Sequence, residues 1–251
     1  MSEKFNDWVT KYQIKPTPLI HVGAHLVQER EMYRLADFEP VLWIEAQPSI
    51  FNQAQKMLQD YKNQSIVNVA LWSISNLELT FYIAGIEGSS SSLLEPHLIS
   101  ASHPQVFTRD KYKIKTKTLD DLLLVQNSGQ NYKILVLDVQ GAEIEVLRGA
   151  EETLKNIDTI VSEISTLELY KGTARVKDLI KFLDSKGFLF VASEMNRATG
   201  WGEGLFIRKS SMDSGAPRGF EHIVVGKHFA PGRLLRTIMI KARKILFGGK
   251  K

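Results

Sequence analysis

The sequence predicts an α/β fold built around a mostly parallel sheet. Short apolar runs such as LIHV (19–22), VLWIEA (41–46) and KILVLD (133–138) alternate with segments in which apolar residues recur at helical spacing. This alternation is typical of βαβ units. The chain has 251 residues, 43% hydrophobic and 24% charged, which suits one large globular domain.

The first half of the chain is expected to contain three sheet strands and an insertion. We predict strands over 19–22, 41–46 and 65–71, a turn at Gly23, a helix over about 28–36, and a helix that begins at Pro48. An extended strand over 77–84 follows. The stretch 85–109 is rich in Ser and His and lacks a clean period, so it is expected to be a long loop with at most a short helix.

The second half continues the same alternation. Strands are predicted over 133–138 and 159–164, and helices over 143–155 and 175–186. The last strands, 188–193 and 204–208, are expected to form an antiparallel hairpin. We therefore divide the chain into an N-terminal segment (1–18), a main domain (19–209) with an insertion loop at about 85–115, and a linker with a C-terminal helix (210–251).

Composition excludes several classes of site. There are no cysteines, so disulfides, thiolate-bound metals and thiol catalysis are ruled out. No apolar run has the length of a signal peptide or a membrane span, which favours a cytoplasmic protein. Residues 227–251 hold 8 of the 32 basic residues and none of the 28 acidic ones, so the remaining body is mildly acidic. This distribution argues against a nucleic-acid-binding body.

Gly23 and Glu45 end the first two strands, 22 residues apart. A glycine there lets a ligand approach the backbone, and an acidic residue at this offset commonly binds ribose hydroxyls. The residues after Gly23 lack the glycines that cradle a pyrophosphate. The pattern therefore favours a nucleoside cofactor without phosphates, although a tight turn and a solvated strand end would look the same.

Asp138 ends the central apolar strand, and Glu163 lies near the end of the next one. Carboxylates at this edge of an open sheet border the ligand crevice. Either could accept a proton, hold a metal or orient a cofactor. The structural alternatives are a helix cap for Asp138 and an ion pair for Glu163.

Several short motifs, taken in order, resemble the FkbM-type family of S-adenosylmethionine-dependent methyltransferases. They are HVGAH (21–25), EAQP (45–48), NVAL (68–71), SSSSL (89–93), TLDDL (118–122) and LDVQGAE (137–143), which runs on into LRGA (147–150). The resemblance implies a Rossmann-like class I methyltransferase fold, with a seven-stranded sheet and helices on both faces. It also implies O-methylation of a sugar or natural product.

The resemblance also implies roles for individual residues. The expected catalytic residues are Asp138, Glu163 and His25, and a divalent metal, if one is bound, would lie on Asp138 and Glu163. The serine motif implies substrate binding by Ser90 and Ser91, and the loop residue His97 is a further candidate. The structural alternatives are a solvated serine-rich segment and an ordinary loop histidine. The expected cofactor-binding residues are His21, Gly23, Ala24, His25, Glu45, Ala46, Ala70, Leu71 and Asp138.

Two departures from the family pattern affect these expectations. His21 and His25 stand where the family usually has Asp and Asn, so the polar contacts of this motif must differ. The structural alternative is two satisfied histidines at a strand end, which is favoured more for His21 than for His25. Gln140 stands where the family usually has Glu, which weakens the case for a metal.

The C-terminal segment is expected to form a basic amphipathic helix. From Arg233 onward, leucine and isoleucine residues fall on one helical face and arginine and lysine residues on the other. Such a helix can lie on an anionic membrane, pack on the body or form a homodimer.

Together these features predict an O-methyltransferase of a sugar hydroxyl, in glycan or glycolipid biosynthesis, peripheral to the inner face of a membrane. A natural-product (polyketide-type) O-methyltransferase, a nucleotide-dependent oxidoreductase and a non-catalytic cofactor-binding module remain alternatives.

Overall fold

The fold is described by a computed structural model covering residues 2–126, 129–196 and 199–212. Seven strands form the main sheet, in the order β3-β2-β1-β7-β8-β10-β9. Their bounds are β1 (Leu19–Val22), β2 (Val41–Glu45), β3 (Gln64–Asn68), β7 (Ile134–Leu137), β8 (Thr159–Ser165), β9 (Phe188–Asn196) and β10 (Trp201–Arg208). All pairs are parallel except those of β10, which runs antiparallel to β8 and β9. The predicted Rossmann-like, mostly parallel sheet and the terminal hairpin are confirmed.

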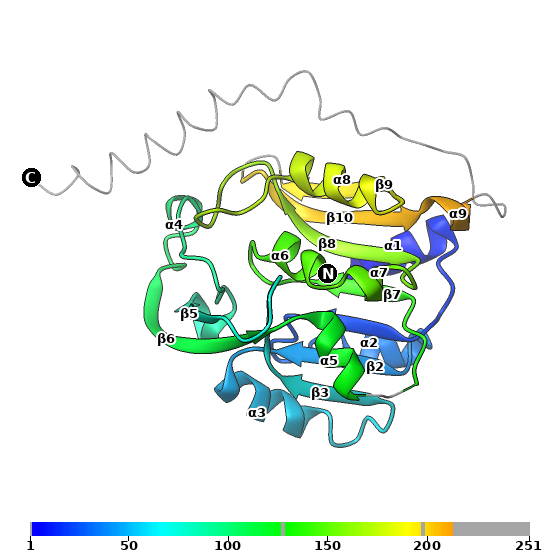
Figure 1. The fold of residues 1–251 in the computed structure, drawn as a ribbon, viewed down its shortest axis with the longest axis horizontal. Helices are drawn as coiled ribbons and strands as arrows, with labels where there is room; N and C mark the ends of the chain where they lie inside the picture. Colours follow the sequence, from blue (N-terminus) through cyan, green and yellow to red (C-terminus); the bar gives the residue numbers. More distant parts are fainter. Residues whose placement is uncertain (1, 127–128, 197–198, 213–251) are drawn as a thin grey trace, which may run out of the picture.

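Helices cover both faces of this sheet (Figure 1). One apolar cluster is shared with α1 (Ser2–Tyr12), α2 (Arg30–Leu35) and α3 (Pro48–Met57). The other is shared with α5 (Leu119–Gln126), α6 (Glu143–Arg148), α7 (Glu151–Leu154) and α8 (Val176–Ser185). A short α9 (Lys209–Met212) follows β10. Since both faces of the parallel strands are buried, those strands are near-continuous apolar runs.

The insertion is more ordered than the predicted loop. It contains a 3₁₀ turn η1 (Ile86–Gly88), α4 (Ile99–Ser102) and most of β6 (Thr108–Lys117). With the segment before it, it forms a second, three-stranded sheet in the order β4-β6-β5, from β4 (Ala70–Leu71), β5 (Glu78–Ala84), which is the strand expected over 77–84, and β6. Strand β6 corrects the expected loop at its C-terminal end. Lysines alternate there with the more buried Tyr112, Ile114 and Thr116, which is a strand pattern. The insertion lies beside the carboxyl edge of the main sheet (Figure 1).

Two predicted elements are each divided. The strand expected over 65–71 splits because the Asn68 side chain donates to the carbonyls of Glu45 and Ala46, at 2.8 and 3.1 Å, and the chain then enters the second sheet. The helix expected over 143–155 breaks at Gly149. A side chain on Gly149 would meet the carbonyl of Trp72 at 2.2 Å, so the chain bends around that backbone.

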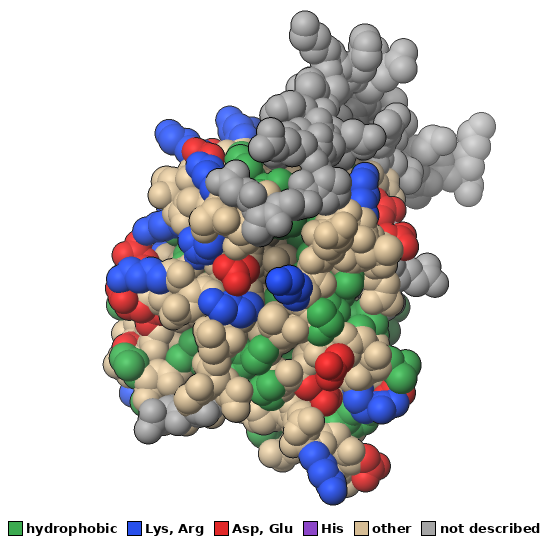
Figure 2. Space-filling model, turned by 90° about the vertical axis from the view of Figure 1, so that its right-hand side faces the viewer, with side chains coloured by type: hydrophobic (Ala, Val, Ile, Leu, Met, Phe, Trp, Pro, Cys, Tyr) green, Lys and Arg blue, Asp and Glu red, His purple; other side chains and the backbone are tan. Residues whose placement is uncertain are grey.

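The N-terminal segment is part of the core. We predicted no element within 1–18, but α1 buries Phe5 and Trp8 in the apolar cluster that it shares with α2 and α3. The expected C-terminal helix lies outside the described residues, apart from the α9 turn. No helix among residues 2–126, 129–196 and 199–212 is long and apolar enough to span a membrane. The face away from the insertion carries interspersed acidic and basic side chains (Figure 2).

His21 belongs to the helix-covered core. Its ring is 2% exposed, stacks on Trp43 with ring centres 4.6 Å apart, and shares a 3.0 Å hydrogen bond between Nδ1 and the Tyr33 hydroxyl. Burial lowers the pKa of His21 to about 3. The neutral ring is therefore the folded form.

This burial predicts a pH-dependent stability. Below the ordinary His pKa of 6.5 the unfolded chain takes up a proton that the folded His21 refuses down to about pH 3. The free energy of unfolding should fall across that window by up to about 1.4 kcal/mol per pH unit from this residue. Urea unfolding at neutral and mildly acidic pH would measure the slope. The double variant His21→Phe/Tyr33→Phe removes both partners and should show a shallower one; equal slopes would contradict the prediction.

Candidate active site

The order of the sheet reverses between β1 and β7, and the candidate site begins there. Ligands of open α/β sheets bind at such a switch point, outside the carboxyl ends of the strands. Gly23 follows β1 with φ +88°, and a side chain there would meet the backbone oxygen of Asp138 at 1.8 Å. Glycine is thus required at position 23 for the ends of β1 and β7 to lie against each other. This requirement adds to the predicted role of Gly23 in letting a ligand approach the backbone.

A pocket of about 660 Å³, including its open mouth, lies at this switch point. We call it the switch-point pocket. One wall comes from the ends of β1, β2 and β7, and the opposite wall comes from the insertion. The residues that line it are Val22, Gly23, His25, Ile44, Glu45, Ala46, Val69, Ala70, Leu71, Phe81, Gly88, Ser89, Ser91, Ser92, Leu93, Asp138, Val139, Gln140 and Ala142.

The carboxylate of Glu45 is held firmly in this pocket. One oxygen accepts the backbone N–H of His25 and the other that of Gln47, each at 2.8 Å. Burial raises the pKa of Glu45, and these backbone hydrogen bonds oppose the shift. Each oxygen keeps a lone pair. The side chain can therefore accept hydrogen bonds from ligand hydroxyls.

Asp138 also borders a second pocket, of about 770 Å³ with its mouth. We call it the acidic pocket. Its walls come largely from the hairpin of β9 and β10. The residues that line it are His103, Asp138, Glu163, Glu194, Asn196, Trp201, Gly202 and Glu203. Asp138 thus stands between the two pockets, within reach of a ligand in either.

The carboxamide of Gln140 connects the two candidate catalytic carboxylates. Its Nε2 lies 2.8 Å from Asp138 Oδ1 and 3.1 Å from Glu163 Oε1, and its oxygen accepts the Tyr170 hydroxyl at 2.8 Å. Burial raises the pKa of Asp138, and the Gln140 hydrogen bond opposes that shift. Burial, followed by the charges of Asp138 and Glu143, raises the pKa of Glu163 well above its usual range.

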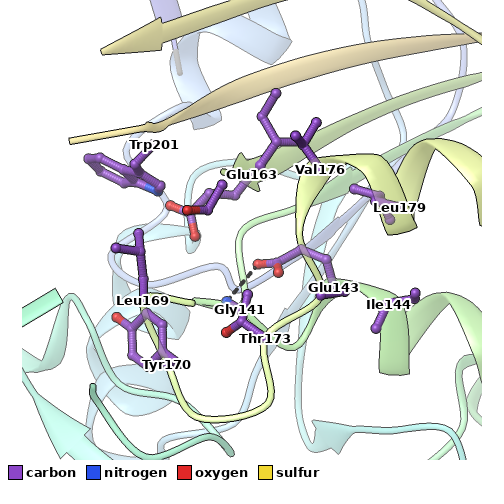
Figure 3. Close-up of a pocket in the computed structure, with 13 residues that line it drawn as sticks. Gly141, Glu143, Ile144, Glu163, Leu169, Tyr170, Thr173, Val176, Leu179 and Trp201 are labelled. Carbon is purple, nitrogen blue, oxygen red and sulfur yellow. Dashed lines mark hydrogen bonds between the residues drawn. The ribbon is translucent and has the colours of Figure 1, made fainter. Parts of the chain in front are cut away.

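A third pocket, of about 380 Å³, adjoins the acidic pocket at Glu163 and Trp201 (Figure 3). Apolar side chains of α6, α8 and the segment after β8 form much of it.

Glu143 accepts the backbone N–H groups of Val139 and Gly141 at 3.2 and 3.0 Å. Burial raises the pKa of Glu143 to about 7. This carboxylate therefore fixes the turn that carries Gln140.

Several residues expected to bind ligands lie elsewhere. Ala24 packs in the same core cluster as Trp43, on the side of the sheet where His21 lies. Ser90 uses its carbonyl to accept the Tyr170 hydroxyl at 3.2 Å, and it does not line the switch-point pocket. His97 is exposed and lines none of the three pockets. Ser91 lines the switch-point pocket, as expected for a ligand-facing residue.

His25 is placed by its neighbours. Its Nδ1 lies 2.8 Å from the Gln28 amide nitrogen, and its Nε2 lies 3.4 Å from the carbonyl oxygen of Glu87. These contacts hold the ring at the mouth of the switch-point pocket, between β1 and the insertion.

Sequence reasoning missed Glu143, Tyr170 and the hairpin side chains of the acidic pocket. Glu143 was visible as a motif residue, but its capping of the turn was not. Trp201 and Glu203 belong to a strand that we expected to begin only at 204. Among the described residues, no group of three or more His, Asp and Glu side chains could hold a metal ion.

Residues 21–190 match the model of the methyltransferase FkbM domain. The 2-O-methyltransferase NoeI of Sinorhizobium fredii (strain NBRC 101917 / NGR234) is 25% identical over 186 residues, 68% of this chain and 73% of NoeI.

Similar solved structures include magnesium protoporphyrin IX methyltransferase (ChlM) from Synechocystis PCC 6803. With S-adenosylmethionine bound it has a TM-score of 0.47 and 9% identity, over 82% of this chain and 77% of ChlM. With the product S-adenosylhomocysteine bound, the TM-score is 0.46 and the identity 11%, over 82% of this chain and 81% of ChlM.

The FkbM match spans more than half of the chain and includes the ends of β1, β2 and β7, which line the switch-point pocket. The chain therefore belongs to the FkbM family of S-adenosylmethionine-dependent methyltransferases, as the order of its motifs predicted.

Proposed function

We propose that this protein transfers the methyl group of S-adenosylmethionine to a sugar hydroxyl, in a glycan or glycolipid. The observation that carries the proposal is the position of Asp138, which borders both the switch-point pocket and the acidic pocket. A cofactor in the first and an acceptor in the second would meet at this carboxylate.

The switch-point pocket suits the cofactor. Glu45 would accept the ribose hydroxyls, because both of its oxygens are already oriented by backbone N–H groups. Ala70 and Leu71, which end the path from β3 into the second sheet, would lie beside the adenine. Gly23 would leave room for the methionine part next to the strand ends. Family membership favours this cofactor over a nicotinamide dinucleotide.

The acidic pocket suits a polyhydroxylated acceptor. Sugar hydroxyls are hydrogen-bond donors, and Glu194, Glu203 and Asn196 supply acceptor oxygens around the pocket. Trp201 offers a flat apolar surface against which the C–H face of a sugar ring can pack. NoeI, a relative described as a 2-O-methyltransferase, adds support for transfer to oxygen. A hydroxylated natural product is the second candidate.

The reaction needs alignment and a proton acceptor. The acceptor oxygen attacks the methyl carbon, the carbon–sulfur bond breaks with its electron pair passing to sulfur, and S-adenosylhomocysteine leaves. The hydroxyl proton passes to Asp138. Glu163, whose pKa is raised further by the nearby charges of Asp138 and Glu143, would hold a proton and leave Asp138 ionised. The pockets place the two substrates in line, which lowers the entropic part of the barrier.

Replacement of the proposed base tests the mechanism. Asp138→Asn keeps the shape of the side chain and one oxygen for the Gln140 amide, but it cannot accept the proton. We expect kcat to fall by about 10²–10⁴-fold, measured as label transferred from radiolabelled S-adenosylmethionine to fractionated cell glycans. The melting temperature and cofactor affinity should stay near those of the wild type. Wild-type turnover by the folded variant would remove Asp138 from the chemistry, and a wild type that labels no glycan fraction would refute the sugar assignment.

Replacement of Glu45 tests the cofactor site. Glu45→Ala should weaken binding of S-adenosylhomocysteine by roughly 1.5–3 kcal/mol, as expected for hydrogen bonds to a charged group. Isothermal titration calorimetry measures this directly. The matched control Glu152→Ala removes an exposed carboxylate on α7 and should leave the affinity unchanged. Equal affinity in both variants would place the ribose elsewhere.

The basic C-terminal segment supports a location at an anionic membrane. Residues 227–251 carry eight basic and no acidic residues, and each basic group near such a surface contributes about 1 kcal/mol, screened by salt. The full chain should co-sediment with anionic vesicles, less so at high salt, while a chain ending at Gly226 should remain in the supernatant with its cofactor affinity intact. Absence of vesicle binding by both chains, with a lower melting temperature for the shorter one, would make the segment structural instead.

A further inference from the structure

The side chain of Gln140 occupies the space between two carboxylates. Its Nε2 is 2.8 Å from Asp138 Oδ1 and 3.1 Å from Glu163 Oε1, and the residue is 9% exposed. An amide nitrogen carries two hydrogens. Both are therefore directed at carboxylates, one at each end of the boundary between the switch-point and acidic pockets.

The other end of this amide is held by a tyrosine. The Tyr170 hydroxyl donates to Gln140 Oε1 at 2.8 Å, and Tyr170 is 2% exposed. If the amide flipped, its oxygen would face two carboxylates and its nitrogen would face the tyrosine. The carboxylates, which accept hydrogen bonds, thus select the orientation in which the amide nitrogen faces them, and the Tyr170 hydroxyl holds the amide oxygen on the other side.

The backbone supports the same arrangement. Gln140 has φ 54° and Gly141 has φ +97°, two consecutive residues in the left-handed region. Such a conformation costs free energy for a residue with a side chain. Here Glu143 stabilises the turn by accepting the N–H groups of Val139 and Gly141. A strained turn held in this way presents Gln140 at one fixed position.

We propose that Gln140 is a positioning residue of the methyl transfer: its carboxamide, held at its oxygen by Tyr170, keeps Asp138 and Glu163 in place across the boundary of the two pockets. This inference rests on the proposed function, in which Asp138 accepts the proton of the acceptor hydroxyl. Without the two donors, the Asp138 and Glu163 side chains would lose the group that joins them, and Asp138 would turn away from the line of transfer. Tyr170 acts on the reaction only through Gln140.

Three variants test this assignment. Gln140→Met keeps the length of the side chain and removes both donors, and Tyr170→Phe removes only the hydroxyl that holds the amide oxygen. The control Tyr61→Phe removes a tyrosine hydroxyl that donates to Glu31 at an exposed site. Labelled transfer to fractionated cell glycans gives kcat and KM, and S-adenosylhomocysteine calorimetry and melting temperatures show that each variant is folded.

We expect kcat to fall on the order of 10²-fold in Gln140→Met, as for a misplacement of about 1 Å, and less in Tyr170→Phe. The KM for S-adenosylmethionine should change little in Tyr170→Phe. The double variant should match Gln140→Met alone, because the two residues act as one unit. Additive losses, or an unchanged kcat in Tyr170→Phe, would overturn the proposal.

Crystal structures with S-adenosylhomocysteine bound provide a measurement that does not depend on the acceptor. In Gln140→Met the Asp138 and Glu163 carboxylates should move apart by about 1 Å or more, whereas in Tyr61→Phe they should not. Unmoved carboxylates in Gln140→Met would overturn the positioning role. If they move but the wild type methylates no glycan fraction, the sugar assignment fails and the positioning geometry is supported.

Discussion

The contact between the ends of β1 and β7 is the constraint on which the site depends. The Asp138 N–H donates to the Val22 carbonyl at 2.9 Å, and Gly23 then packs so closely on the Asp138 carbonyl that no side chain fits. Both Gly23 and Ala24 donate to the Ile44 carbonyl of β2. Three strand ends are thereby joined through one glycine, which brings Glu45 and Asp138 to the same pocket. A β-carbon at position 23 would push the ends of β1 and β7 apart, and Glu45 and Asp138 would then lie farther from each other.

Burial of several carboxylates at one sheet edge is the main electrostatic cost of this arrangement. Removing a charge from water is expensive unless hydrogen bonds replace its hydration. The structure supplies those bonds locally: backbone N–H groups for Glu45 and Glu143, and the Gln140 amide for Asp138 and Glu163. The raised pKa values show that the compensation is partial. Carboxylates whose pKa is raised by burial bind protons more readily than exposed ones.

The sequence was sufficient to predict the main sheet because its strands are apolar on both faces and its helices are periodic. β1 and α8 were placed to within about a residue, and the Gly23, Glu45 and Asp138 positions follow from the rule that ligands bind at carboxyl ends. The side-chain network was not predictable in the same way. His21 was expected among the cofactor-binding residues, but strand alternation turns it toward Tyr33 and Trp43, which fits the alternative of a satisfied histidine at a strand end.

Other features depended on contacts between distant segments. The break at Gly149 is set by the backbone of Trp72, and the Asp120 carboxylate caps α7 by accepting the N–H groups of Glu152 and Thr153 at 2.9 and 2.8 Å. Nothing in the local sequence specifies those partners. The α1 helix, in contrast, could have been predicted from the sequence, because Phe5 and Trp8 have helical spacing and both are buried.

The insertion and the segment after β8 behave as one wall of the site. Leu169 accepts the backbone N–H groups of His97 and Ile99, and Lys171 pairs with Glu95 through both its backbone N–H and its ammonium group. This joins the insertion, which lines the switch-point pocket, to the segment that carries Tyr170. Tyr170 contacts both the Ser90 carbonyl and the Gln140 amide, and that amide contacts Asp138 and Glu163. The serine-rich stretch is therefore linked to the two carboxylates through Tyr170 and Gln140. Its role in the fold is therefore structural at Ser90, even though neighbouring serines face the pocket.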